Sequence, residues 1–168
     1  GRLCRLLSIG KTRAGKGACH LDWSDVADWN EGLLAMLVPD RADATTQAAL
    51  ARTKRLFGER TYMALSVRRR PKDAIRLRDL SRIAAAAGVP TIATNDVLYH
   101  VPERRQLQDV VTCIREKCTI DTLGRTRERF ADRYLKTGAE MTRLFRRYLK
   151  DSSPVAPPGG FAKRCAFN

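Results

Sequence analysis

Asp96 and His100 are the residues whose types and spacing best fit a chemically active site. They lie in the stretch TIATNDVLYHVPERRQLQDVV, residues 91–111, which opens as a β-branched run and ends in a basic helical pattern. A carboxylate directly after a buried strand, followed closely by an imidazole, fits a metal ligand or a general base. The alternative is that Asp96 caps the loop after Asn95 through local hydrogen bonds, as Asx residues often do.

Histidine is too scarce here to build a rich metal cluster. The sequence contains only His20 and His100, whereas a hydrolytic metal site usually needs three or more His and carboxylate ligands. Each histidine is therefore expected to be a hydrogen-bonded structural residue. The sequence also shows no Ser-His-Asp or Cys-His arrangement, no P-loop and no C-x-x-C pair. The residues of this chain therefore predict no catalytic activity of its own.

The charge of the chain points to a polyanionic partner. Lys and Arg number 32 against 18 Asp and Glu, a formal net charge of +14, and such a surplus attracts nucleic acid. Arginine dominates, which suits bidentate contacts with phosphate; the alternative is a coding bias toward arginine without function. We expect weak, salt-sensitive, sequence-independent DNA binding. Two groups are candidates for phosphate contacts: Arg68, Arg69 and Arg70, and Arg143, Arg146 and Arg147.

The elements that must position these residues alternate between helix and strand. Apolar runs predict strands over 31–38, 61–67 and 89–94, and helical periodicity predicts helices over 43–57 and 72–87. The unbroken run EGLLAMLV (31–38) is typical of a strand buried on both faces. Connections of this length make neighbouring strands parallel. The fold class is therefore predicted to be α/β.

Apolar stripes predict which helix residues face inward. A short opening helix is expected to stop at Gly10. Cys113 and Cys118, five residues apart near a helix end, are not expected on one face, and all five cysteines should be reduced. The residues expected to be buried are Leu50 and Phe57; Ile75, Leu80 and Ile83; Leu107, Val110, Val111 and Ile114; and Met141, Leu144, Phe145 and Tyr148.

No apolar run approaches the roughly 20 residues of a membrane helix, and no secretory leader opens the chain. A soluble, cytoplasmic protein without a membrane partner is therefore expected. Residues 151–168 are rich in Pro and Gly and cannot continue the last helix.

Four segments resemble one family. ATNDVLYHVPERRQLQDVVTCIRE looks like the signature of the PHP domain of bacterial C-family DNA polymerases, the polymerase III alpha-subunit family, and NDVLYH with LQDVVTCIR is most similar to its error-prone branch. GRLCRLLSIGKTRAGKG, EGLLAML and YLKTGAEMTRLFRRY agree in order and spacing. The resemblance covers residues 1–150, nearly the whole chain.

The resemblance implies part of a distorted β/α barrel, with parallel strands alternating with helices. Residues 1–150 would be the C-terminal part of a PHP-like domain that lacks its beginning, and residues 151–168 a tail leading into a lost segment. Asp96 keeps the aspartate of the family's Asp-x-His ligand motif, but Leu98 stands at the histidine's place and Ala64 at that of a glutamate. The resemblance therefore implies no stable metal cluster and no cofactor in this chain; Mg²⁺ would belong to the parent polymerase.

By this resemblance the chain is a segment of an error-prone DNA polymerase used in replication and damage-tolerance repair. It would act as a non-catalytic structural domain whose partners are DNA and the remaining polymerase domains. The alternatives are a stand-alone PHP-type metal-dependent phosphoesterase and a truncated gene product without function. We also expect marginal stability of the isolated chain, because strands of the barrel would be missing and a sheet edge exposed.

Overall fold

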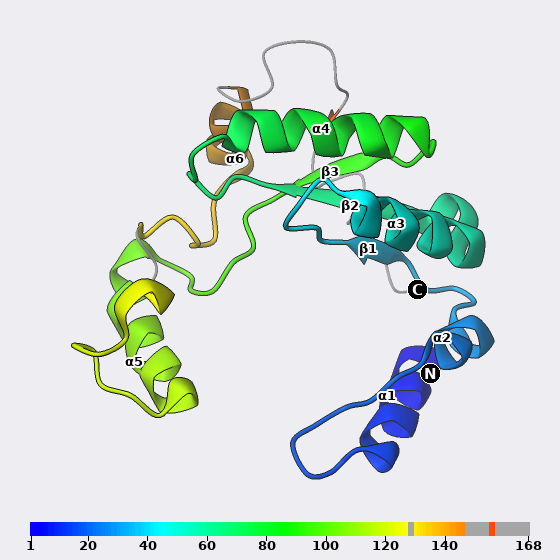
Figure 1. Ribbon diagram of the computed structural model, residues 1–168, viewed down its shortest axis with the longest axis horizontal. Helices are drawn as coiled ribbons and strands as arrows, with labels where there is room; N and C mark the ends of the chain where they lie inside the picture. The colour runs from blue at the N-terminus through cyan, green and yellow to red at the C-terminus, as the bar shows by residue number, and fades with distance from the viewer. Residues whose placement is uncertain (128–129, 147–154, 157–168) are drawn as a thin grey trace.

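A parallel sheet forms the centre of the fold. The computed structural model describes residues 1–127, 130–146 and 155–156, and its strands lie in the order β1-β2-β3-β4, each pair parallel (Figure 1). The strands are β1 (Ala35–Leu37), β2 (Thr61–Ser66), β3 (Thr91–Thr94) and β4 (Val155–Ala156). The helices are α1 (Arg2–Arg13), α2 (Trp23–Trp29), α3 (Ala44–Phe57), α4 (Asp73–Ala86), α5 (Arg105–Glu116) and α6 (Gly138–Arg146).

The predicted alternation of helices and parallel strands is confirmed. α3 joins β1 to β2, and α4 joins β2 to β3, so each connection is a helical crossover of the kind that parallel strands require. The strands in the described ranges form a sheet and not a closed barrel. The barrel therefore stays a prediction.

The core lies between β2 and the two crossover helices. All six residues of β2 are buried, and Met63 and Leu65 pack in one cluster with Leu50 of α3 and with Leu77 and Leu80 of α4. α6 adds Met141 and Phe145 to this cluster, as predicted. Since both crossover helices reach the same cluster, they cover the same face of the sheet.

The inward side of α4 was only partly predicted. Leu80 is fully buried, but Ile75 is 47% exposed, so its predicted burial is wrong. The buried stripe of α4 is rotated away from Ile75, and it consists of Asp73, Leu77, Leu80, Ser81 and Ala84.

The first strand is shorter and more open than predicted. Only Ala35–Leu37 pairs, its side chains are half-buried, and Val38 is 53% exposed. The prediction of a strand buried on both faces is therefore wrong. Among the described strands β1 lies at the end of the order and pairs with β2 alone, so its outer edge carries no strand of the described residues.

α1 continues through Gly10, contrary to prediction, and ends at Arg13. A Cβ at Gly10 would lie 2.6 Å from Cys19 Sγ and 2.8 Å from Leu21 Cγ. Glycine is therefore needed here for a close approach between the helix and the following loop. Arg13 then holds the first turn of α2, because it donates to both carboxylate oxygens of Asp25 at 2.6 and 3.0 Å.

α5 carries its apolar stripe on the outside, which is the largest departure from prediction. Four residues that were expected to be buried are 40–73% exposed. They form what we call the α5 apolar face: Leu107, Val110, Val111 and Ile114. The buried positions of α5 are Asp109, Thr112 and Cys113 instead. Figure 1 shows α5 standing apart from the sheet, so the core of the sheet does not cover this face.

The end of α5 brings two cysteines together. Lys117 adopts a left-handed conformation with φ 53°, and the N–H of Cys118 donates to the carbonyl oxygen of Cys113 at 3.0 Å. Burial and the neighbouring Cys118 thiol raise the pKa of Cys113. Cys118 lies beyond the end of α5, so the two cysteines do not share a helix face, as expected; the turn at Lys117 nevertheless folds the chain back and brings their thiols together. Within the described ranges, no helix is long and apolar enough to cross a membrane.

An arginine-rich pocket as candidate functional site

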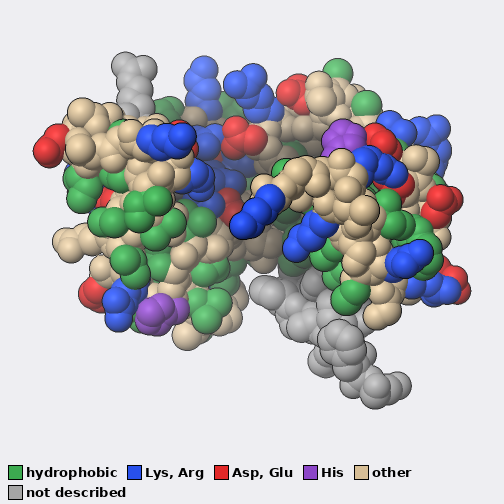
Figure 2. All heavy atoms as spheres, turned by 90° about the horizontal axis from the view of Figure 1, so that it is seen from below, with side chains coloured by type: hydrophobic (Ala, Val, Ile, Leu, Met, Phe, Trp, Pro, Cys, Tyr) green, Lys and Arg blue, Asp and Glu red, His purple; other side chains and the backbone are tan. Residues whose placement is uncertain are grey.

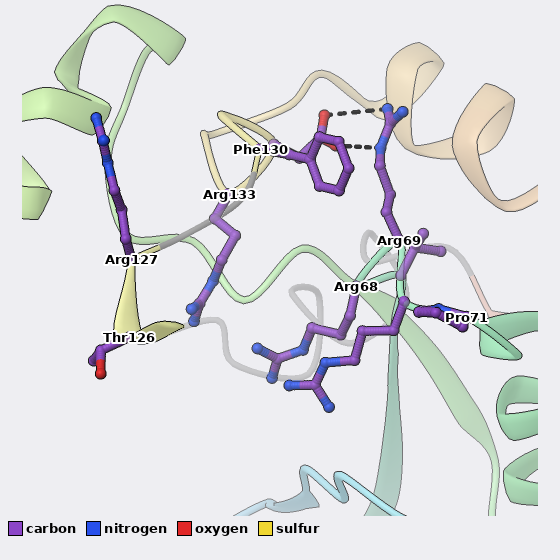
Figure 3. Close-up of a pocket in the computed structure, with 10 residues that line it drawn as sticks. Arg68, Arg69, Pro71, Thr126, Arg127, Phe130 and Arg133 are labelled. Atoms are coloured by element: carbon purple, nitrogen blue, oxygen red, sulfur yellow. Dashed lines mark hydrogen bonds and ion pairs between the residues drawn. The ribbon is translucent and has the colours of Figure 1, made fainter. Parts of the chain in front are cut away.

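The candidate site lies beyond the carboxyl ends of β2 and β3. The last residues of these strands, Ser66 and Thr94, are paired, and their hydroxyls are 2.9 Å apart. Ligands of open parallel sheets commonly bind at this edge. A cavity of about 330 Å³ opens here (Figure 3). It is lined by Val67, Arg68, Arg69, Arg70, Pro71, Thr126, Arg127, Phe130, Asp132 and Arg133.

Asp96 is held by two arginines at this edge. Its Oδ2 accepts from Arg68 at 2.5 Å and from Arg133 at 2.7 Å. Arg133 Nε also donates to the backbone carbonyl of Asp96 at 2.9 Å. The carboxylate that the sequence singled out as a metal ligand or general base is therefore the centre of an arginine–carboxylate cluster. We call these three side chains the Asp96 cluster.

Asn95 fixes the loop that carries Arg133. Its side-chain amide donates to the carbonyl oxygens of Asp132 at 2.7 Å and of Tyr134 at 2.6 Å. The backbone N–H of Leu98 donates to the carbonyl of Arg133 at 2.8 Å. These bonds hold the segment after β3 beside the segment before α6. The guanidinium of Arg133 therefore reaches Asp96, although the two residues are 37 positions apart in the sequence.

The backbone is strained around the pocket. Four non-glycine residues of the described ranges have positive φ, and three of them lie here: Arg69 at 51°, Lys72 at 67° and Asp96 at 46°. Such conformations cost free energy and persist where the surrounding contacts enforce them, often at functional sites. The ion pairs of Arg69 with Asp132 and of Asp96 with its two arginines are contacts of this kind.

The predicted arginine groups come from distant segments but meet at one edge. Arg68, Arg69 and Arg70 line the cavity, whereas Arg143 and Arg146 line a second cavity of about 620 Å³. The two cavities share Arg69 and Asp132. Figure 2 shows a hollow on one face of the molecule, with lysine and arginine side chains along it. Arg147, the remaining predicted contact, lies outside the described residues.

Sequence reasoning missed two arginines of the pocket. Arg133 binds Asp96, and Arg127 Nε lies 3.0 Å from Oδ2 of the buried Asp109 of α5. Both lie in a polar loop without periodicity, so no local pattern indicated a role. One signal could have indicated that such partners exist. An Asn-Asp pair directly after a buried strand needs hydrogen-bond partners for its polar side chains, although the sequence does not say which residues supply them.

The other residues discussed for a metal site do not surround Asp96. Ala64 is buried in β2, Leu98 is 39% exposed, and His100 lies at the surface. In the part of the chain that the structure describes, no group of three His, Cys, Asp or Glu side chains is close enough to hold a metal ion. The absence of a bound metal in solution stays a prediction.

Glu140, in the second cavity, makes stability depend on pH. Its carboxylate accepts from the Thr137 N–H and hydroxyl, each at 2.9 Å, and from the Tyr134 hydroxyl at 2.8 Å. These bonds, the backbone one first, lower the pKa of Glu140 from 4.5 to about 2. A lowered folded-state pKa stabilises the fold fully above 4.5, and this contribution disappears as pH falls through about 2.

We therefore expect Glu140→Gln to remove part of the acid sensitivity of the fold. Between pH 5 and pH 2 the urea midpoint of the parent chain should fall more than that of the variant. Tyr134→Phe removes one of the three donors and should give an intermediate pH profile. Parallel profiles for the parent chain and Glu140→Gln would show that the carboxylate is not held in this way.

Comparison with known proteins shows that the chain is similar to one segment of several bacterial DNA polymerases. It is 58% identical over 168 residues to error-prone DNA polymerase 1 of Agrobacterium fabrum, covering all of this chain. It is 50% identical over 167 residues to error-prone DNA polymerase 2 of the same organism and 49% identical over 169 aligned positions to the error-prone DNA polymerase of Rhodopseudomonas palustris BisB5. Each match covers at least 99% of this chain but only 15% of the relative. No family model matches the chain.

Proposed function

Because the whole chain is homologous to one segment of error-prone DNA polymerases, we propose that it serves as a non-catalytic, PHP-like structural domain of such a polymerase. The single observation that carries this proposal is identity of 58% spread over all 168 residues. The activity would be template-directed DNA synthesis by the rest of the polymerase, with Mg²⁺ bound there. The partners of this segment would be the remaining polymerase domains and DNA.

The chemistry around Asp96 supports a structural role over metal-dependent hydrolysis. A carboxylate bound to two guanidinium groups has its charge already compensated, so it attracts a metal ion less than a carboxylate among neutral ligands would. The two other positions that the family resemblance assigns to ligands hold Ala64 and Leu98, which have no donor atoms in their side chains. The Asp96 cluster instead ties the ends of β2 and β3 to the loop before α6.

The arginine-lined edge would lie near DNA in the assembled polymerase. Guanidinium groups contact phosphates without reading the base sequence. Binding by this chain alone is expected to be weak and to fall steeply with salt, since it would depend on releasing counterions from DNA.

A segment exchange tests the proposal. In error-prone DNA polymerase 1 of Agrobacterium fabrum, the segment that matches this chain would be replaced by these 168 residues. We expect the chimera to extend a primer on a DNA template at a rate within about threefold of the parent, because the polymerase chemistry is contributed by the other domains. The same polymerase with the segment deleted should lose most of its activity.

Two results would contradict this function. A chimera that is expressed and folded but inactive would show that the chain does not substitute for the segment. Full activity of the deletion variant would show that the segment does not support synthesis.

A further inference from the structure

We propose that Cys113 and Cys118 form an oxidation site, at which a hydroperoxide converts the two thiols into a reversible disulfide within the chain. The site lies where α5 ends and the following loop begins. It does not depend on the proposed function, because neither cysteine takes part in the Asp96 cluster or lines the arginine-rich cavity.

The backbone turn at the end of α5 is the first support. Lys117 adopts the left-handed conformation, and its N–H lies 3.4 Å from the carbonyl oxygen of Ile114. The N–H of Cys118 donates to the carbonyl oxygen of Cys113 at 3.0 Å. These two bonds form a Schellman motif, in which the side chains at the first and last of its six positions commonly touch. Here both of these residues are cysteines, so the turn brings two thiols together.

The state of the two thiols is the second support. Both cysteines are free, and Cys113 is buried whereas Cys118 is only half-buried. Burial, followed by the neighbouring Cys118 thiol, raises the pKa of Cys113, so this thiol keeps its proton. Figure 1 shows α5 standing apart from the sheet, which leaves its end open to a small oxidant. A peroxide therefore reacts first with Cys118, and Cys113 is the resolving thiol.

The reaction has two steps that balance. The thiolate of Cys118 attacks the terminal oxygen of the hydroperoxide, the O–O bond breaks, and the alkoxide leaves as an alcohol with the proton of that thiol. Cys118 is then a sulfenic acid. The sulfur of Cys113 attacks this sulfenic sulfur, and hydroxide leaves as water with the proton of the second thiol. The hydroperoxide is reduced by two electrons, one from each sulfur.

The disulfide should be easy to reduce again. It closes a loop of only six residues, from Cys113 to Cys118, and so short a loop removes little freedom from the unfolded chain. The bond therefore adds little stability, and a small thiol opens it by exchange. While closed, it ties the end of α5 to the segment that leads to Arg127, whose guanidinium pairs with Asp109 of the same helix.

Peptide mapping tests the bond. The full 168-residue chain is treated with hydrogen peroxide, its remaining thiols are alkylated, and tryptic peptides are identified by mass spectrometry. Trypsin places Cys113 on peptide 106–115 and Cys118 on peptide 118–125. We expect these two peptides to be joined, with a mass lower than their sum by two hydrogen atoms, and to separate after treatment with dithiothreitol.

Dilution of the protein distinguishes a bond within one chain from a bond between chains. Because both thiols belong to the same turn, the fraction of joined peptides should not change when the protein is diluted about tenfold at constant peroxide. Links between two chains through the exposed Cys4 and Cys19 should become rarer on the same dilution.

Two substitutions of Lys117 test whether the turn is responsible. Lys117→Gly and Lys117→Val remove the same positive charge, but glycine adopts the left-handed conformation readily and β-branched valine does not. We expect the disulfide to form several-fold more slowly in Lys117→Val than in Lys117→Gly. Cleavage after Arg115 is retained in both variants, so the two cysteines still fall on separate peptides.

Trapping with dimedone tests the roles of the two thiols. Cys113→Ser should accumulate sulfenic acid at Cys118, because no resolving thiol is left, and should give several-fold more adduct than the parent chain. Cys118→Ser should give little adduct at the buried Cys113. If serine at this buried position prevents folding, Cys113→Ala provides the same test.

Four results would overturn the inference. These are equal rates in the two Lys117 variants, joined peptides whose fraction falls on dilution, oxidation of Cys118 to the sulfinic acid without any joined peptide, and dimedone adduct at Cys113 in place of Cys118. The segment exchange is carried out under reducing conditions, so its outcome does not depend on this bond and the two proposals fail separately.

Discussion

Asp73→Ala is expected to lower the free energy of unfolding by about 3–5 kcal/mol, the cost of breaking a buried ion pair from one side. Asp73 lies at the start of α4 and is 3% exposed. It accepts from the backbone N–H of Arg68 at 2.6 Å and from Arg76 Nε at 2.9 Å. Arg76 in turn donates to the carbonyl of Ser66 at the end of β2. Without Asp73, the guanidinium of Arg76 stays largely buried beside a carbonyl and without its carboxylate.

Urea unfolding followed by circular dichroism measures this loss. Asp79→Ala, on the exposed side of the same helix, is the matched control and should cost less than about 0.5 kcal/mol, because its pairs with Arg78 and Arg82 are solvated. Domains of this kind are stable by only about 5–15 kcal/mol, so Asp73→Ala should be partly unfolded at 37 °C. Similar stabilities of the two variants would show that the buried pair is not a main support of the fold.

Val111→Glu is expected to turn a self-associating chain into a monomer. The α5 apolar face exposes four large aliphatic side chains at helical spacing, and contiguous apolar surface of this kind promotes association. In sedimentation velocity the parent chain should show a mass that rises with concentration in the range of tens of micromolar. A carboxylate in the middle of the face would have to be desolvated in any such contact, so Val111→Glu should keep the mass of one chain.

Gln106→Glu adds the same charge at an exposed position beside that face, and it provides the control. It should leave association nearly unchanged. If Val111→Glu still associates, the α5 apolar face is not the contact surface. The outer edge of β1 would then be the surface to test next.

Local sequence signals predicted the elements that are most fully buried. The runs around Met63 and Ile92 gave β2 and β3, and the turn-forming Gly88, with φ 62°, ends the α4 segment where expected. Periodicity also placed Leu50 and Leu80 inside. These predictions succeeded because burial of a central strand, or of the inner side of a helix packed on it, leaves a recognisable pattern of apolar residues in the local sequence.

Properties that depend on a distant segment could not be predicted in this way. The apolar stripe of α5 correctly indicated one apolar helix face, but it could not indicate whether another part of the chain packs on that face. In the structure Val111 and its neighbours on the stripe are exposed. Likewise, Asp96 was found from its position after a strand, but its partner Arg133 comes from a loop without any periodic pattern. Whether such a carboxylate meets metal ligands or guanidinium groups is decided by tertiary contacts.

The Asp96 cluster also limits how readily a metal site could be built at this carboxylate. Leu98→His alone would add an imidazole, but an arriving divalent cation would still meet two guanidinium groups within 2.7 Å of the same carboxylate oxygen. Removing Arg133 first would weaken the attachment of the loop after β3, since this arginine also donates to the backbone carbonyl of Asp96. A metal site at this position would therefore require several substitutions together, because the imidazole and the removal of guanidinium charge are both needed.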